Sequence, residues 1–122
     1  WAADAVGGIY PLLAPTVGAL GAFLAGSNTV SNMMFSQFQF GVAESLGLST
    51  ALMVAVQAVG AAAGNMVAIH NVVAASATVG LLGREGQTLR KTVWPTLYYL
   101  VMTGSIALLA AYGLGLTDPL LN

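Results

Sequence analysis

Small polar side chains gather in a short segment of an otherwise apolar sequence. Residues 27–32 read Ser-Asn-Thr-Val-Ser-Asn, so five hydroxyl or amide side chains fall within six residues. Burying such groups without hydrogen-bond partners in an apolar medium costs several kcal/mol. Helix capping satisfies some of them, because Ser, Asn and Thr are good N-caps. We expect the others to bind a ligand, an ion or water.

The ligand that this segment suits best is an anion. A helix that begins within the membrane directs free backbone N–H groups and the positive end of its dipole toward its neighbour. Small hydroxyl and amide groups beside it can donate further hydrogen bonds to a carboxylate. The three apolar stretches of the sequence, residues 5–43, 45–83 and 92–117, contain no Lys or Arg. Neutral donors would therefore hold the anion in this part of the protein. The candidate substrate-binding residues here are Ser27, Asn28, Thr29, Ser31 and Asn32.

A second polar segment, residues 64–71, reads Gly-Asn-Met-Val-Ala-Ile-His-Asn. Asn65 and Asn71 add two candidate substrate-binding amides. His70 is the one ionisable residue inside the apolar stretches, and an ionisable residue within a membrane indicates function by default. Imidazole exchanges protons near neutral pH, so His70 is a candidate for proton coupling. The alternative is a neutral histidine that bonds a carbonyl across a helix interface.

Three glutamines have roles that the pattern leaves open. Gln57 precedes the second polar segment, and Gln37 and Gln39 stand among phenylalanines at 35, 38 and 40. The last two could face a cavity or bond one helix to another, and their spacing does not distinguish these alternatives.

Composition indicates a membrane protein. Of the 122 residues 57% are hydrophobic and 6% are charged, and the mean hydropathy is +0.84, whereas soluble domains carry about 25% charged residues. A net charge of -1 gives no indication of a nucleic-acid partner. With no cysteine, one histidine and four scattered acids, we expect no metal site and no cofactor. We do not expect an enzyme either, because His70 together with a serine such as Ser76 is weak evidence for a catalytic site.

The order of charges and polar breaks predicts an all-α membrane fold. A helix needs about 20 residues to cross the hydrocarbon core, and irregular backbone at that depth must be surrounded by protein or line a cavity. We therefore predict a re-entrant helical hairpin over residues 12–43 with its tip at 27–32. A discontinuous transmembrane helix over 46–83, broken near 64–71, and a final transmembrane helix over 92–116 complete the prediction. Two plain spans joined by a polar turn are the alternative for the hairpin.

Glycine spacing adds a prediction about the break. The run from Gly60 to Gly64 is a small-xxx-small pattern that lets helices approach closely. Most of these glycines we interpret as packing residues. At Gly64 we predict the helix break itself, with Asn65 capping the next helical segment.

The three basic residues set the predicted orientation. All of them lie in residues 84–91, and the positive-inside rule places that loop in the cytoplasm. Trp94, Tyr98 and Tyr99 would then lie at the inner interface, and Pro95 suits the first turn of the last helix. The C-terminus would be external.

These residues resemble the L-lactate permease family. The likeness covers residues 15–99, and within it the Ser-Asn-Thr of 27–29 and the Gly-Asn-Met of 64–66 are typical. The runs that carry it are 18–35, 57–66, 70–76, 83–86 and 90–92.

The resemblance implies a multi-pass transporter of the bacterial inner membrane that moves L-lactate, and often D-lactate or glycolate, with a proton. It implies that this chain is the C-terminal part of a longer permease. The expected partners are the N-terminal part of that permease and the lipid bilayer. In the related ion-transporter superfamily, Ser-Asn-Thr motifs at hairpin tips hold carboxylates and coupling ions. Ser27, Asn28 and Thr29 match that motif, whereas Gly64-Asn65-Met66 departs from it. A transporter of another carboxylate in that superfamily, or a channel subunit, is the alternative.

Overall fold

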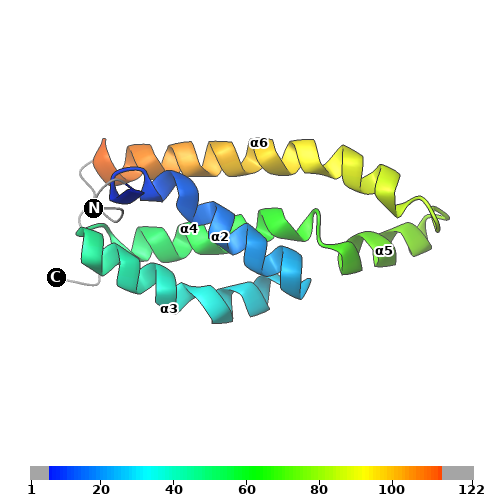
Figure 1. Cartoon of the computed structure of the whole chain (residues 1–122), viewed down its shortest axis with the longest axis horizontal. Helices are drawn as coiled ribbons and strands as arrows, with labels where there is room; N and C mark the ends of the chain where they lie inside the picture. Colours follow the sequence, from blue (N-terminus) through cyan, green and yellow to red (C-terminus); the bar gives the residue numbers. More distant parts are fainter. Residues whose placement is uncertain (1–5, 114–122) are drawn as a thin grey trace.

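The computed structural model describes residues 6–113, and over that range it is helical with no strand. This confirms the all-α fold class. Its five principal helices run back and forth along one long axis (Figure 1). They are α2 (Tyr10–Ala25), α3 (Asn28–Leu46), α4 (Thr50–Asn65), α5 (Ile69–Thr78) and α6 (Glu85–Tyr112).

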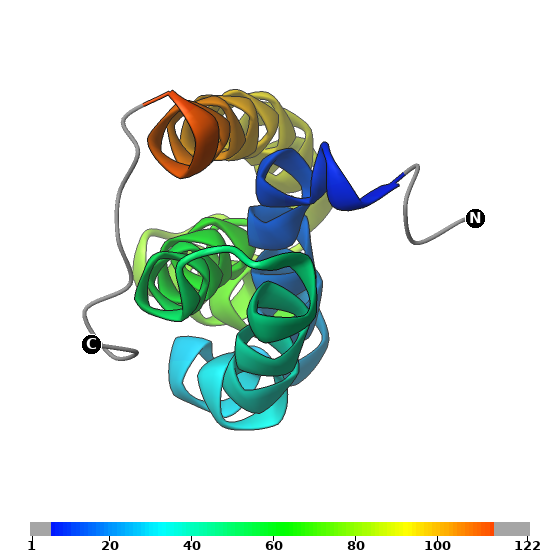
Figure 2. The same cartoon turned by 90° about the vertical axis from the view of Figure 1, so that its left-hand side faces the viewer.

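Helices α2 and α4 form the centre of the bundle. Seen end-on, they lie between α3 on one side and α6 on the other (Figure 2). Glycines make the central contact close, because a Cβ atom on Gly60 would overlap the Pro15 carbonyl and one on Gly64 would overlap the Ala19 carbonyl. The small-xxx-small pattern therefore packs α4 against the backbone of α2.

Helices α2 and α3 form a hairpin with a very short reversal. Gly26 ends α2 in the left-handed conformation (φ 66°), and its N–H bonds the Ala22 carbonyl. Ser27 is extended and caps α3, because its Oγ accepts from Val30 N at 3.3 Å. The reversal is narrower than the predicted tip over 27–32, because residues 28–32 already form the first turn of α3.

Helices α4 and α5 form the bent pair that the second polar segment predicted. The chain bends by 48° between them, across residues 66–68. The predicted position of the break at Gly64 is wrong, because Gly64 lies inside α4 and is needed for contact with α2. The predicted cap is also wrong: Asn65 is the last residue of α4, and Ala68 precedes α5 without a side-chain cap.

Helix α6 begins earlier than predicted. Residues 85–91 form its first turns instead of a loop, and Pro95 therefore lies in the helix interior, not in its first turn. Glu, Gln, Arg and Lys favour helix. The charged residues therefore indicate where the chain meets water, and they do not indicate that the helix ends there. Glu85 also suits the positive end of the helix dipole. The predicted end at residue 116 lies outside the described residues.

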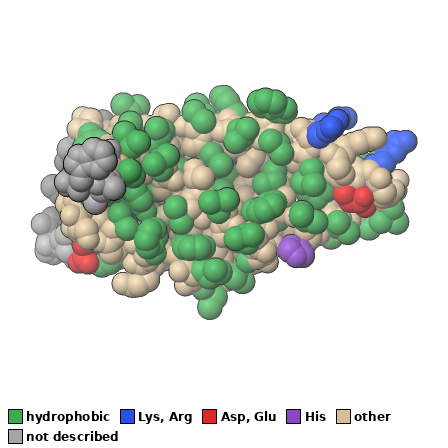
Figure 3. Space-filling model, viewed as in Figure 1, with side chains coloured by type: hydrophobic (Ala, Val, Ile, Leu, Met, Phe, Trp, Pro, Cys, Tyr) green, Lys and Arg blue, Asp and Glu red, His purple; other side chains and the backbone are tan. Residues whose placement is uncertain are grey.

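One helix in the described range, α6, is long and apolar enough to cross a membrane, and the bent α4–α5 pair qualifies if it is counted as a single span. At 28 residues, α6 is about 42 Å long. Hydrophobic side chains are spread over the length of the visible surface, and Lys and Arg gather at one end (Figure 3). Met33 is 80% exposed and Trp94 is 74% exposed. Surfaces this apolar are expected of a membrane protein.

Candidate functional site

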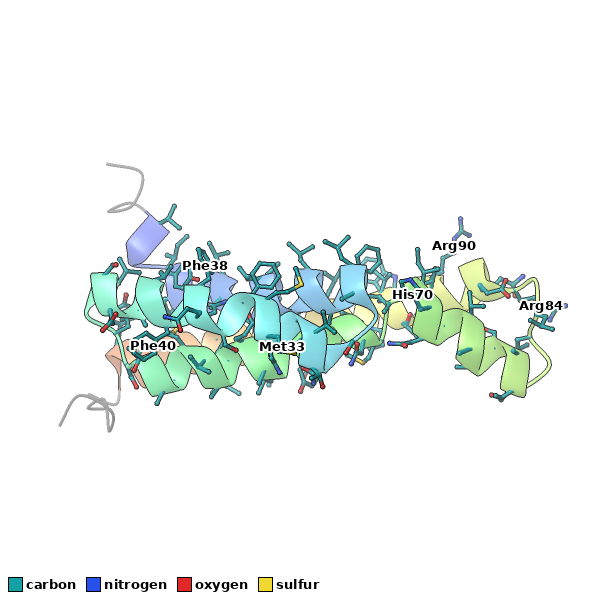
Figure 4. The ribbon with its side chains drawn as sticks, turned by 90° about the horizontal axis from the view of Figure 1, so that it is seen from below. Met33, Phe38, Phe40, His70, Arg84 and Arg90 are labelled. Atoms are coloured by element: carbon teal, nitrogen blue, oxygen red, sulfur yellow. The ribbon has the colours of Figure 1, made fainter. Side chains whose placement is uncertain are left out.

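The reversal between α2 and α3 lies against the break between α4 and α5. A Cβ atom placed on Gly26 would stand 2.9 Å from Nδ1 and 3.2 Å from Cγ of His70. The imidazole therefore rests on the backbone of the reversal. Figure 4 shows His70 beside the hairpin, on the side facing the end that carries Arg84 and Arg90. The hairpin reversal and the second break, more than 30 residues apart in sequence, thus lie against each other at this point and form the candidate site.

The hairpin supplies the hydroxyl and amide groups of this site. Asn32 Nδ2 donates to Asn28 Oδ1 at 3.1 Å, one turn apart on α3. Thr29 is exposed, and Ser27 is half-buried at the cap. The Oδ1 atom of Asn32 is buried and has no hydrogen-bond partner among the described residues. An acceptor left in that state is a place where a water, a proton donor or a substrate hydroxyl would be stabilised.

The broken helix supplies the other side of the site. Asn71 Nδ2 donates to both the backbone carbonyl and Oδ1 of Asn65, each at 3.4 Å, so the side chain of α5 bridges back to the end of α4. His70 is exposed and makes no hydrogen bond within the described range. The alternative interpretation, a neutral histidine bonded to a carbonyl across a helix interface, therefore finds no such carbonyl among the described residues. Ser76 is buried, so α5 does not present it together with His70.

Four helix ends meet at this site, and their dipoles differ in sign. Helices α3 and α5 begin here and direct backbone N–H groups at it, whereas α2 and α4 end here and direct carbonyl groups at it. An N-terminus favours an anion and a C-terminus favours a cation or a proton donor. The arrangement can therefore accommodate a carboxylate and a proton without any charged side chain. Within residues 6–113 there is no group of three metal-ligating side chains.

Ser31 belongs to the same polar segment, but the structure places it between helices. It is fully buried there, and its Oγ donates to the Gly18 carbonyl at 2.8 Å. Gln57 Nε2 donates to the same Oγ at 3.1 Å. Its hydroxyl is thus committed to protein partners, and the structure gives it a role in helix packing.

A chain of hydrogen bonds continues from Ser31 through the interior. Gln57 Oε1 accepts from Gln39 Nε2 at 3.1 Å, and Gln39 Oε1 accepts from the Tyr10 hydroxyl at 2.7 Å. Gln39 Nε2 also donates to the Ala14 carbonyl at 3.1 Å. Both glutamines are 0% exposed. The chain joins α2, α3 and α4 behind the site.

These glutamines are the residues whose roles the sequence pattern leaves open. Gln39 bonds helix to helix, which is one of its two alternatives, while Gln37 is exposed on the same helix. The signal that could have found the network is the pairing itself: two amides in apolar helices, which need partners wherever lipid or protein surrounds them. The sequence does not show which of these amides bond each other, because that depends on how the helices pack.

The comparison with known proteins covers nearly the whole chain. The sequence profile of the L-lactate permease family matches residues 2–114. A putative L-lactate permease of Haemophilus influenzae is 42% identical over 89% of this chain and 20% of its own length. The glycolate permease GlcA of Escherichia coli is 37% identical over 87% of the chain and 19% of its own length. The L-lactate permease of Bacillus subtilis is 33% identical over 84% and 18% respectively.

The chain thus spans about a fifth of the length of the curated relatives that it matches. No solved structure matches it significantly.

Proposed function

The chain belongs to the L-lactate permease family, and on that premise we propose that it is the C-terminal part of a proton-coupled symporter of L-lactate and related small 2-hydroxy monocarboxylates, such as glycolate. Relatives named for lactate and for glycolate support this substrate class. The permease would be a multi-pass protein of the bacterial inner membrane, completed by an N-terminal part, and not an enzyme.

The observation that carries the proposal is the contact between the two helix breaks. His70 on α5 rests on Gly26 at the hairpin reversal, so its imidazole lies beside the start of α3. Coupled transport requires that the binding of substrate and the binding of the proton influence one another, and neighbouring sites allow this directly. Broken helices near the membrane midplane are the usual way in which transporters build such sites.

Each candidate residue has a role in this proposal. The α3 N-terminus with Ser27, Asn28 and Thr29 binds the carboxylate. The free Asn32 Oδ1 accepts from the 2-hydroxyl of the substrate, which would fill its missing hydrogen bond.

The second break holds the remaining roles. His70 carries the proton, and Asn65 with Asn71 contributes amide groups while tying α5 to α4. Ser31 fixes α3 against α2 instead of contacting substrate.

The membrane arrangement follows the same proposal. The α2–α3 hairpin enters and leaves the membrane on the external side, and α4–α5 crosses it as one broken span. The basic end of the molecule, which carries Arg84 and Arg90, faces the cytoplasm. Helix α6 then returns outward.

The test is uptake of labelled L-lactate and glycolate by the full-length permease in transport-deficient cells, with the proton gradient intact or collapsed. We expect gradient-dependent uptake that Asn28→Ala abolishes. Gln37→Ala is the matched control, because it removes an exposed amide from the same helix away from the break. Uptake that persists unchanged in Asn28→Ala contradicts the proposed site, and a well-expressed permease that transports neither compound contradicts the proposed substrate class.

A further inference from the structure

A pocket of about 320 Å³ lies at the basic end of the molecule, where the turn after α5 meets the first turns of α6. It is separate from the two helix breaks and shares no residue with them. Two cations, three neutral polar side chains and one apolar side chain line it. They are Arg84, Lys91, Gln87, Thr88, Thr92 and Leu81.

The two cations of this pocket, Arg84 and Lys91, have no ion-pair partner among the described residues. The neighbouring acid, Glu85, is not among the lining residues, and its Oε1 accepts a hydrogen bond from Gly83 N at 3.0 Å. The start of α6 adds the positive end of a helix dipole. A concave site with two free cations, hydroxyls and an amide is suited to a phosphate group.

The surroundings of the pocket decide which phosphate compound fits. Val79 and Leu82, next to the lining residues in the turn, are exposed, and Trp94, one turn beyond Lys91, is also exposed. A Trp beside basic residues is typical of a membrane–water interface. A free phosphate has no apolar group, and the single methyl group of a lactate anion is too small to cover three apolar side chains. A phospholipid has both parts, and basic pockets at the cytoplasmic ends of transmembrane helices bind anionic headgroups.

We propose that this pocket binds the headgroup of an anionic phospholipid between Arg84 and Lys91, with the acyl chains along the apolar surface of Val79, Leu82 and Trp94. The lipid anchors the turn between α5 and α6. Because α5 carries His70, the lipid also steadies the element that forms one side of the transport site.

The test measures lipid binding to the delipidated, full-length permease in detergent by native mass spectrometry. Dioleoylphosphatidylglycerol is compared with dioleoylphosphatidylcholine, which has the same acyl chains and a zwitterionic headgroup. We expect Arg84→Gln and Lys91→Gln each to weaken phosphatidylglycerol binding about fivefold, as one basic contact at a membrane surface predicts. Phosphatidylcholine binding should be weaker and unchanged.

Arg90→Gln is the matched control, because it removes one positive charge from the same turn of α6 as Lys91 without touching the pocket. It should change phosphatidylglycerol affinity less than twofold, and Arg84→Lys, which keeps the charge, should fold and retain most of the binding. An equal loss in Arg90→Gln, or equal affinity for the two lipids, overturns the proposal. Displacement of phosphatidylglycerol by millimolar inorganic phosphate or lactate would assign the pocket to a soluble anion and overturns it as well.

Discussion

Gln39 Nε2 donates a hydrogen bond to Gln57 Oε1 at 3.1 Å and so joins α3 to α4 at a point where neither side chain is exposed. The bond is the middle link between Tyr10 on one side and Ser31 on the other. All four residues lie in the hairpin and α4, the elements that end at the candidate site. The network therefore fixes α2, α3 and α4 relative to one another, and with them the positions of the two helix breaks.

Replacing Gln39 with Leu should destabilise the folded permease. The change removes the hydrogen bond that Gln39 makes with each of the Tyr10 hydroxyl, the Ala14 carbonyl and Gln57 Oε1. A buried polar group that loses its hydrogen bond costs about 1–3 kcal/mol. The free energy of unfolding, measured by titration from mild detergent into dodecyl sulfate, should fall by that order.

A double-mutant cycle isolates the bond itself. Gln39→Leu with Gln57→Leu should cost less than the sum of the two single changes, by about 0.6 kcal/mol, the average for hydrogen bonds between membrane helices, and by no more than about 1.7 kcal/mol. Gln37→Leu serves as control, because that side chain is exposed on the same helix. Strict additivity of Gln39 and Gln57 would show that they do not interact.

Much of the element order can be predicted from sequence, and the reason is local. Apolar runs interrupted by Ser, Asn and Gly indicate helices with breaks, and Ser27 caps α3 as its residue type favours. The pattern places the second break at Gly64, which is too early, because a glycine at this position is compatible with two structures. A glycine permits both a helix break and close packing, and only the position of Ala19 on α2 decides between them.

The remaining features depend on contacts that no local pattern encodes. The charged residues at 85–91 indicate a loop by their polarity, although the same residue types favour helix once the chain leaves the lipid. The Gln39–Gln57 bond joins residues 18 positions apart, and the contact of His70 with Gly26 requires both breaks to be in place. Residue type identifies such side chains as candidates, but only the packed helices pair them.

Gly26→Ala should impair transport more than stability. Gly26 has φ 66°, which L residues rarely adopt, and an added Cβ would meet His70 Nδ1 at 2.9 Å. Gly47→Ala is a close control, because Gly47 ends α3 with φ 67° and nothing lies within 4 Å of the place that a Cβ would take there. Both variants carry similar backbone strain, of about 1–2 kcal/mol.

Only the Gly26 variant displaces the imidazole from the reversal. We therefore expect similar falls in melting temperature for the two variants, and loss of lactate uptake in the Gly26 variant alone. Equal uptake by the two proteins would show that the contact between the breaks is dispensable.

Gly60→Ala and Gly64→Ala should separate α2 from α4. Each added methyl group would overlap a backbone carbonyl, of Pro15 and Ala19 respectively, which cannot rotate away as a side chain does. Overpacking of this kind costs about 1–3 kcal/mol. Gly41→Ala should instead stabilise the protein by about 0.5–1 kcal/mol, because Gly41 lies within α3 with open space around it. Thermal unfolding of the three purified variants distinguishes these outcomes, and a neutral Gly60 variant would contradict the packing.

His70→Ala should separate proton coupling from substrate binding. If His70 carries the proton, the variant loses uptake driven by a proton gradient, because residues 6–113 offer no other ionisable side chain in the two polar segments to take up the proton. Exchange of labelled external lactate for unlabelled internal lactate involves no net proton movement, so it should persist in proteoliposomes. Thr78→Ala is the control on the same helix, since its exposed hydroxyl bonds only the Ala75 carbonyl, at 2.7 Å. Loss of exchange together with driven uptake in His70→Ala would assign His70 to substrate binding, and retention of both would remove it from the mechanism.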